Sequence, residues 1–176
     1  EAAGLDPLLL ERKTAALLAF LALEGAASRS KLAGMAWPDV LESGARSNLR
    51  QRLHRLRSRV GAELFFSDEP LRLSPKLEVD AVQLESLVFM GDHAQALLLE
   101  GELLSGMDFD DCPELEEWVS SARERLRAGP EAGLGRAPAG LNLRLILHPA
   151  KHGCALPAAI LAVPGRCRET RPAGIA

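Results

Sequence analysis

Between Ser43 and Val60 the chain carries six arginines and no acidic residue. These are Arg46, Arg50, Arg52, Arg55, Arg57 and Arg59. Guanidinium groups stay charged and bind phosphate oxygens and guanine edges, so this composition is typical of a nucleic-acid-binding segment. Leu49, Leu53, Leu56 and Val60 recur at intervals of 4, 3 and 4. This spacing predicts that the segment is a helix with one buried stripe.

The arginines are expected to flank the apolar stripe on both sides, because successive residues turn by about 100° around a helix. Arg46, Arg50 and Arg57 belong to one flank, and Arg52 and Arg59 belong to the other. The face opposite the stripe carries Ser47, Gln51, His54, Arg55 and Ser58. In a major groove the flanks would reach phosphates and the far face would meet base edges.

We therefore predict a DNA-contacting surface on this helix and on the hairpin that follows it. Gln51 and Arg55 are the candidate base readers, since glutamine can bind adenine and arginine can bind guanine. Arg72 in the hairpin is expected to add a minor-groove or phosphate contact. The predicted set is Arg46, Ser47, Asn48, Arg50, Gln51, Arg52, His54, Arg55, Arg57, Arg59 and Arg72.

Two alternatives compete with DNA binding. The arginines could pair with acids elsewhere, such as those of residues 80–128, which would leave a helical protein–protein interaction module that no longer binds DNA. RNA binding is less favoured, because the basic segment lacks interleaved aromatic residues for base stacking.

The elements that would position this surface can be predicted from the preceding residues. Helical spacing covers residues 7–24 and ends at Gly25. A short helix capped by Ser28 or Ser30 follows, and it stops at Trp37 because Pro38 disfavours a helical conformation there. After the arginine helix, residues 64–73 alternate as in a β-hairpin. Three helices followed by a hairpin is the order of a winged helix.

The rest of the chain divides into two further parts. Residues 80–128 predict helices at 80–90, 92–100 and 113–128, with Asp80 as one cap and Asp111 with Glu114 as a capping box. We expect these helices to pack mainly on one another. Residues 129–176 are rich in Gly, Pro and Ala, and only 141–147 resembles a strand, so we expect this tail to be disordered or weakly structured. The predicted domains are thus 1–79, 80–128 and 129–176.

Charge is distributed unevenly among these parts. Residues 1–79 hold 12 Lys and Arg against 10 Asp and Glu, residues 80–128 hold 3 against 12, and residues 129–176 hold 6 against 2. DNA would be repelled by the middle part, so any contact must be local. No apolar run approaches the roughly 20 residues that span a bilayer. Three scattered cysteines do not suggest a disulfide framework. We predict a cytoplasmic protein that does not bind membranes.

Several segments, in the right order over about residues 7–128, resemble one family. They are RKTAALLAFLALEG (12–25), SKLA (30–33), AWPD (36–39), ARSNLRQRLHRLR (45–57), LRL (71–73), VD (79–80), GELL (101–104) and DCPELEEW (111–118). Together they resemble the SARP-type bacterial transcriptional regulators. These regulators carry an OmpR-like winged helix-turn-helix followed by a bacterial transcriptional activator domain (BTAD).

The resemblance implies an α+β, mostly α protein that controls transcription, with residues 43–60 in the major groove of double-stranded DNA. It places a short TPR-like helical module, a partial BTAD, at 80–128. RNA polymerase would be a partner of an activator, and a homodimer on tandem half-sites is compatible with the family. Two departures are expected: the family's sheet before the first helix is reduced to at most residues 5–10, and the activator domain is truncated.

No enzymatic activity, cofactor or metal is predicted. His148, His152, Cys154 and Cys167 could be written as a zinc set, but their spacing fits no common template. The acids between residues 108 and 117 are better explained as a helix cap and a solvated face than as a cation site. The chain has no glycine-rich phosphate loop and no plausible triad partner for His54 or His93. Trp37 and Trp118 are expected to anchor helices in the core.

Overall fold

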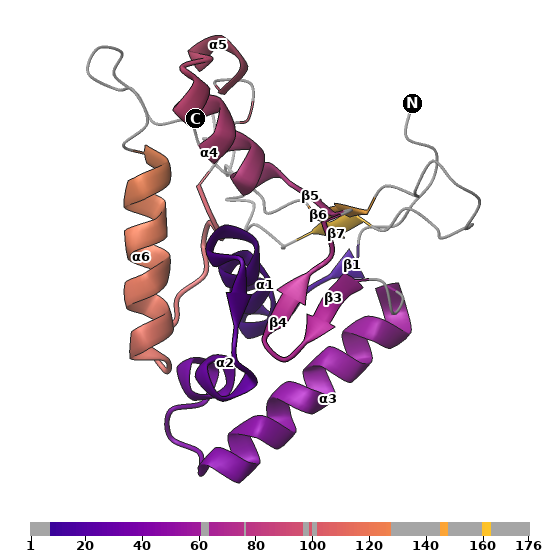
Figure 1. Cartoon of the computed structure of the whole chain (residues 1–176). Coiled ribbons are helices and arrows are strands. Elements are labelled where there is room, and N and C mark those ends of the chain that lie inside the picture. Colours follow the sequence, from indigo (N-terminus) through magenta and orange to yellow (C-terminus); the bar gives the residue numbers. More distant parts are fainter. Residues whose placement is uncertain are drawn as a thin grey trace, which may run out of the picture.

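The computed structural model describes residues 8–60, 64–75, 77–96, 99, 102–127, 145–147 and 160–162. These residues form a mostly helical α+β fold with small sheets at one side, as predicted (Figure 1). Within this described part, no helix is long and apolar enough to cross a membrane.

Helix α1 (Arg12–Glu24) begins at Arg12 rather than at residue 7, because Leu8–Leu9 form strand β1. A short apolar run carries no period that distinguishes a strand from a helix, which explains the wrong boundary. The helix ends at Gly25, which has a φ of +85° and donates its N–H to the carbonyl of Leu21 at 3.1 Å. Glycine adopts this φ without a steric penalty.

Helix α2 (Arg29–Ala36) starts at a side-chain cap. Ser28 Oγ accepts the backbone N–H of Lys31 at 3.2 Å, so Ser28 rather than Ser30 is the cap. Helix α3 (Glu42–Val60) follows a short connection, residues 37–41. A Cβ added at Gly44 would lie 2.7 Å from Cγ1 of Val40, so glycine allows this connection to approach α3 closely.

The predicted hairpin is present. Strands β3 (Phe65–Asp68) and β4 (Leu71–Leu73) pair antiparallel, and β2 (Ala26–Ala27) joins the other edge of β4. The sheet order is β2-β4-β3. Strand β2 was not predicted, since two alanines carry no β-type pattern of their own.

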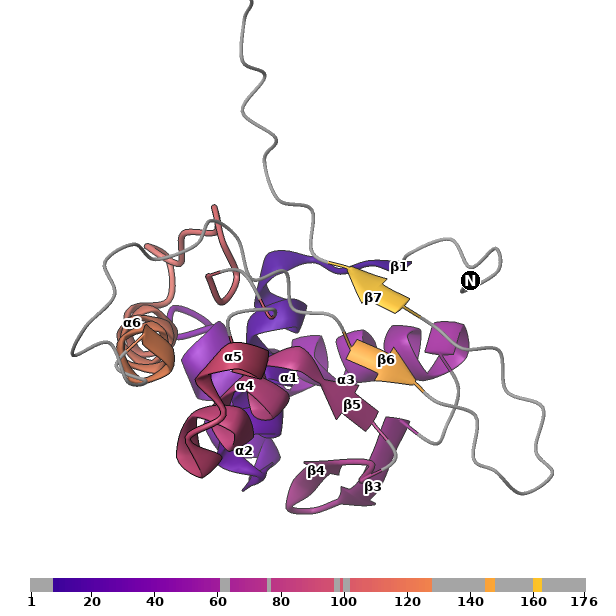
Figure 2. The same ribbon diagram turned by 90° about the horizontal axis from the view of Figure 1, so that it is seen from above.

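A second sheet joins the two ends of the described chain. Its order is β1-β7-β6-β5, with β5 at Leu77–Val79, β6 at Leu145–Leu147 and β7 at Ile160–Ala162 (Figure 2). Strand β7 is parallel to β1, whereas β6 is antiparallel to both β5 and β7. Strand β6 falls within the predicted 141–147 segment. Strand β7 corrects the expectation that the rest of the tail forms no strand; the tail's other residues lie outside the described part.

Three helices follow strand β5 in the described chain: α4 (Asp80–Met90), α5 (His93–Ala96) and α6 (Pro113–Arg127). Asp80 is the first residue of α4, not its cap, and its carboxylate accepts the N–H of Ala81 at 2.8 Å. Helix α5 is shorter than the predicted 92–100; residues 97, 98 and 100 are outside the described part.

The helices after residue 80 pack on one another, as predicted, and also against α1 and α2. Helix α4 contacts α5 and α6, while α6 also contacts α2 and α4 also contacts α1. The contacts with α1 and α2 add to the predicted packing. The stripe predicted on α6 is confirmed: Leu115, Val119 and Ala122 are buried. Trp118 and Leu126 are partly buried against the same core, because the stripe faces α1 and α2.

One continuous hydrophobic core therefore includes residues from both sides of position 79. Leu18, Leu32 and Leu49 from the first helices belong to the same buried cluster as Phe109 and Leu115. The rings of Phe20 and Trp118 lie 5.0 Å apart, and Trp37 is also partly buried, which confirms both tryptophans as core anchors. The predicted domain boundary at residue 79 stays a prediction.

Removal of the tail strands should destabilise the fold. A chain ending at residue 127 lacks β6 and β7, so β1 and β5 lose their hydrogen-bonded neighbours. We expect the free energy of unfolding to fall by about 2 kcal/mol. This corresponds to a fall in melting temperature of about 5 °C, which circular dichroism can measure. A chain ending at residue 165 keeps both strands and is the control. Equal melting temperatures for the two truncations would contradict a structural role for the strands.

Candidate nucleic-acid interface

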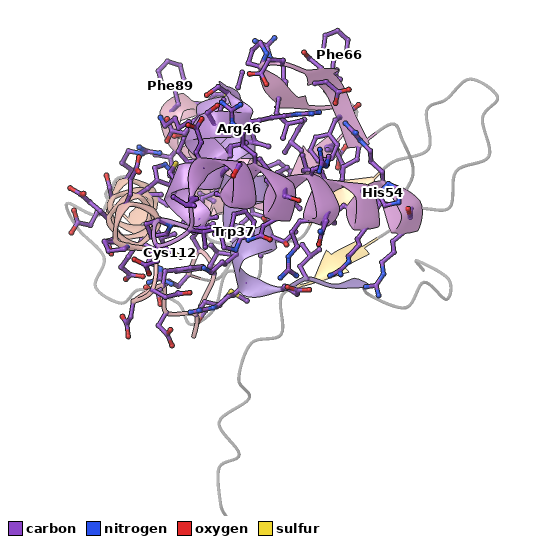
Figure 3. The ribbon with its side chains drawn as sticks, turned by 90° about the horizontal axis from the view of Figure 1, so that it is seen from below. Trp37, Arg46, His54, Phe66, Phe89 and Cys112 are labelled. Atoms are coloured by element: carbon purple, nitrogen blue, oxygen red, sulfur yellow. The ribbon has the colours of Figure 1, made fainter. Side chains whose placement is uncertain are left out.

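Helix α3 lies across one outer face of the molecule, with its apolar stripe turned inward. Leu49, Leu53, Leu56 and Val60 are buried, as predicted, and Ala45 extends the stripe by one turn. The stripe packs mainly against α2. Figure 3 views the molecule from the α3 side, with Arg46 toward one end of the helix and His54 toward the other.

The face of α3 opposite the stripe is open to solvent. Gln51, His54, Arg55 and Ser58 are exposed, whereas Ser47 is half-buried. Asn48 is also half-buried. The two predicted base readers, Gln51 and Arg55, are thus accessible from the same side of the helix.

Three of the six arginines are held by acids from three different segments. Arg46 pairs with Glu42 of its own helix at 2.7 Å and donates to Ser30 Oγ of α2. On the opposite flank, Arg52 pairs with Glu11, which precedes α1. Arg57 pairs with Asp68 of β3 and lies over the ring of Phe65, 5.1 Å from its centroid. These contacts fix guanidinium groups at both flanks of α3.

Among the described residues, the other three arginines of α3 have no acidic partner. Arg50, Arg55 and Arg59 are exposed, and Arg50 makes a 3.5 Å contact with Ser47 Oγ one turn away. Together they leave a positive charge on both flanks and on the far face of the helix. An anion that approaches this side meets three guanidinium groups that no acid of the described ranges neutralises.

The hairpin and α2 add residues to the same side of the molecule. Arg72, predicted from sequence, is exposed on β4. Sequence reasoning missed Arg29, whose Nη2 lies 3.0 Å from Asp68 Oδ1, and Phe66, whose surface is 70% exposed. Arg29 directly follows the Ser28 cap, a position at the start of α2 that could have indicated it. Phe66 appeared in sequence only as one residue of an alternating strand.

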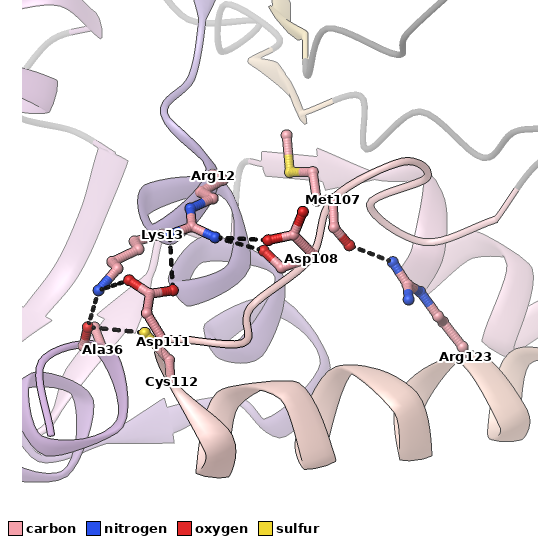
Figure 4. Close-up of polar contacts among 8 residues, drawn as sticks. All are labelled: Arg12, Lys13, Ala36, Met107, Asp108, Asp111, Cys112 and Arg123. Carbon is pink, nitrogen blue, oxygen red and sulfur yellow. Dashed lines mark hydrogen bonds and ion pairs between the residues drawn. The ribbon is translucent and has the colours of Figure 1, made fainter.

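Those acids of residues 80–128 that form ion pairs in the described part pair with α1 or α6. Asp108 and Asp111 bind Arg12 of α1 at 3.0 and 2.7 Å, and Asp111 also binds Lys13 at 2.8 Å (Figure 4). The predicted capping role of Asp111 therefore gives way to an ion-pair cluster that joins the loop before α6 to α1. In the described ranges no acid of this segment pairs with an arginine of α3.

The same cluster includes the last carbonyl of α2. Lys13 Nζ donates to Ala36 O at 2.7 Å, and the Cys112 thiol donates to that oxygen at 3.1 Å. Burial raises the pKa of the Cys112 thiol, so it stays protonated at neutral pH and remains a donor. Burial alone would lower the pKa of Lys13, but its hydrogen bonds to Asp111 and Cys112 outweigh this, and the pKa is raised.

Arg123 of α6 holds the loop that carries Asp108. Its guanidinium donates to the carbonyls of Leu103 and Leu104, each at 2.9 Å, and reaches that of Met107 at 3.4 Å. Leu104 has a φ of +53°, a conformation that non-glycine residues rarely adopt. The guanidinium and the burial of the Leu104 side chain together stabilise this turn.

A second polar contact fixes α6 against α1. Glu24 Oε1 accepts hydrogen bonds from Trp118 Nε1 at 2.9 Å and from Arg125 at 2.8 Å. The hydrogen bonds from Trp118 and Arg125 lower the pKa of Glu24, because they favour the ionised carboxylate.

Metal binding gains no support from the described residues, where no three His, Cys, Asp or Glu side chains form a group that could hold an ion. The predicted but disfavoured zinc set lies outside the described part. Comparisons of the chain with protein-family models, with curated proteins and with solved structures found no match. The function must therefore be argued from the residues themselves.

The contact between α1 and the loop before α6 should weaken in acid. A hydrogen bond from Lys13 lowers the pKa of Asp111. The contribution of Asp111 to the stability of the fold is therefore complete above the usual carboxylate pKa. It is lost as pH falls through the lower pKa that Asp111 has in the folded state. We expect Asp111→Asn to lower the free energy of unfolding in urea by about 0.5–1 kcal/mol at pH 6.5, since Asp111 is exposed and its partner Lys13 is half-buried. At pH 3 the loss should be much smaller, because protonation weakens the pair in the unaltered chain.

Asp110→Asn is the matched control, because Asp110 is exposed and no ion pair holds it among the described residues. Its urea profiles should follow those of the unaltered chain at both pH values. A constant deficit for Asp111→Asn across the pH range would contradict an electrostatic role.

Proposed function

We propose that this chain is a sequence-specific DNA-binding transcriptional regulator that inserts α3 into the major groove. The observation that carries the proposal is the exposed arginine face of α3. Ion pairs fix arginines on both flanks of this face. Among the described residues, no acid of residues 80–128 pairs with an arginine of α3. The length of α3 also supports the proposal. Its 19 residues extend about 28 Å at 1.5 Å per residue.

The order of elements supports a winged helix-turn-helix. Helices α1, α2 and α3 precede the β3–β4 hairpin, and α3 packs on α2. In this arrangement α3 is the recognition helix and the hairpin is the wing, so that Arg72 and Phe66 would lie near the duplex beside the groove. A major groove about 12 Å wide accommodates one helix.

Each residue of the α3 surface has an expected role. The flanking Arg46, Arg50, Arg57, Arg52 and Arg59 would bind phosphates of the two strands. On the far face, Gln51 and Arg55 would contact base edges, with Ser47, Asn48 and His54 beside them. The net charge of −3 does not oppose this, because the acids of residues 102–116 pair with α1 and α6 or lie away from α3.

The helices after residue 80 would form a partial BTAD, a short TPR-like module packed on the DNA-binding helices. An activator would contact RNA polymerase through it and could bind tandem half-sites as a homodimer. Such a regulator would act in the cytoplasm of a bacterium and would need no cofactor or catalytic residue.

One observation favours the alternative of an interaction module without DNA binding. Phe89 and Met90, at the end of α4, are 92% and 69% exposed. Large exposed apolar side chains mark protein contacts. The two functions differ in their response to DNA: only the regulator would bind a duplex with a strong dependence on salt.

DNA binding can be tested on Arg50 and Arg59, the two flanking arginines for which the described residues provide no ion pair. Fluorescence anisotropy of the full chain with a labelled duplex should show salt-sensitive binding. Arg50→Gln with Arg59→Gln should reduce the slope of log K against log salt by about two, since each lost phosphate contact removes about one. Neither change leaves an acid without its partner.

Arg125→Gln is the control, because Arg125 lies on α6 and its loss should not alter the slope, while its partner Glu24 keeps the hydrogen bond from Trp118. A double variant with the unaltered slope would refute the phosphate contacts. A folded chain that binds no duplex at any salt concentration would refute the function and favour the interaction module.

Base recognition requires a separate measurement. A preferred duplex is first selected from a randomised library with the unaltered chain. Arg55→Ala or Gln51→Ala should then reduce the preference for that duplex over a scrambled one by about 1–3 kcal/mol. Arg59→Gln should weaken both duplexes equally. If Arg55→Ala also weakened both equally, Arg55 would be a phosphate contact and not a reader.

A further inference from the structure

Two arginines from different helices converge on one oxygen of a hairpin carboxylate. Arg29 of α2 and Arg57 of α3 both donate through Nη2 to Asp68 Oδ1 on β3. We propose that Arg29 and Arg57 form a phosphate site of the DNA backbone, which Asp68 occupies in the free protein and which the phosphate takes over on binding. The inference rests on the proposed function and adds to it an internal competitor.

The geometry is that of an oxyanion site. Guanidinium groups bind carboxylate and phosphate oxygens through the same fork of donors, so a carboxylate can stand in for a phosphate. Arg57 is held over the Phe65 ring, and the capped start of α2 fixes the backbone of Arg29. The Arg57 guanidinium is therefore held by an element other than Asp68, and the Arg29 side chain extends toward it from a fixed backbone.

The carboxylate satisfies this site only in part. Both arginines reach the same oxygen through a single nitrogen, so neither contact is the bidentate pair that guanidinium favours. Arg29 Nε is buried and has no hydrogen-bond partner in the part of the chain that the structure describes. A phosphate has two free oxygens at tetrahedral angles, so it can accept from the two arginines on separate atoms.

Asp68 is also easily displaced. Its side chain is 64% exposed, and ion pairs of exposed carboxylates contribute little to stability. Hydrogen bonding from Arg57 lowers the pKa of Asp68, so the carboxylate is charged at neutral pH and competes with any incoming anion. Competition of this kind lowers the affinity for all duplexes alike, because backbone contacts carry no sequence information.

The test is Asp68→Asn in the full chain, measured by anisotropy against specific and scrambled duplexes. We expect affinity for both to rise about fivefold, which corresponds to the loss of one weak competing pair. Glu69→Gln, an equal change of charge one residue away in the same turn, should raise it less than twofold. Arg29→Gln combined with Asp68→Asn should abolish the gain, because the site then lacks one of its two cations.

The outcomes separate this inference from the proposed function. If the unaltered chain binds DNA and Asp68→Asn binds no tighter than Glu69→Gln, the internal competitor is refuted while the function stands. Weaker binding by a folded Asp68→Asn chain would show that the carboxylate orients the arginines and would also overturn the inference. If Asp68→Asn does not fold, Asp68→Ser takes its place with the same expected gain and the same contradicting outcomes, because serine also removes the competing charge.

Discussion

Helix α1 is buried on every side, and the other elements are arranged around it. Eight consecutive residues, from Thr14 to Leu21, are buried, which leaves this helix without a solvent face in its centre. Three of the eight are alanines with no exposed surface, and such small side chains allow neighbouring backbones to approach closely. Helices α2 and α4 and strand β4 all contact α1, and α3 is connected to α1 through α2.

This arrangement sorts the charges of the chain. The first turn of α1 presents Arg12 and Lys13 to the acids of residues 108–111, which concentrates much of the negative charge beside α1 and away from α3. Among the described residues, the six arginines of α3 meet three acids, each from a different segment. An acidic protein can thus present one positive surface.

Sequence periodicity predicted the parts of the fold that depend on local pattern. The boundaries of α3 and α6, the buried leucines and the hairpin all follow from apolar spacing, a turn and a stop signal. The apolar spacing also placed the exposed face of α3, because a helix with one buried stripe must expose the opposite side. Which arginines would find acidic partners could not be predicted this way, since Glu11 and Asp68 approach α3 from other elements.

The misplaced predictions all depend on contacts between distant residues. Strands β2 and β7 are too short to carry a pattern, and each exists because a partner strand lies beside it. Asp111 satisfies a local capping rule, yet the cations of α1 offer it stronger contacts. Arg29 and Asp68 are 39 residues apart in the chain, so nothing in either neighbourhood indicates the pair.

The pairing of β1 with β7 has a consequence for synthesis on the ribosome. Leu8 lies beside Leu161, so the strand that is made first waits for one of the last described segments. At roughly 5–20 residues per second, that delay is on the order of ten seconds. Helices α1 to α3 and the hairpin depend on nearer contacts and can form meanwhile, while the β1 and β5 edges stay unpaired. The nascent chain thus passes through a stage in which its arginine surface is assembled before its second sheet is closed.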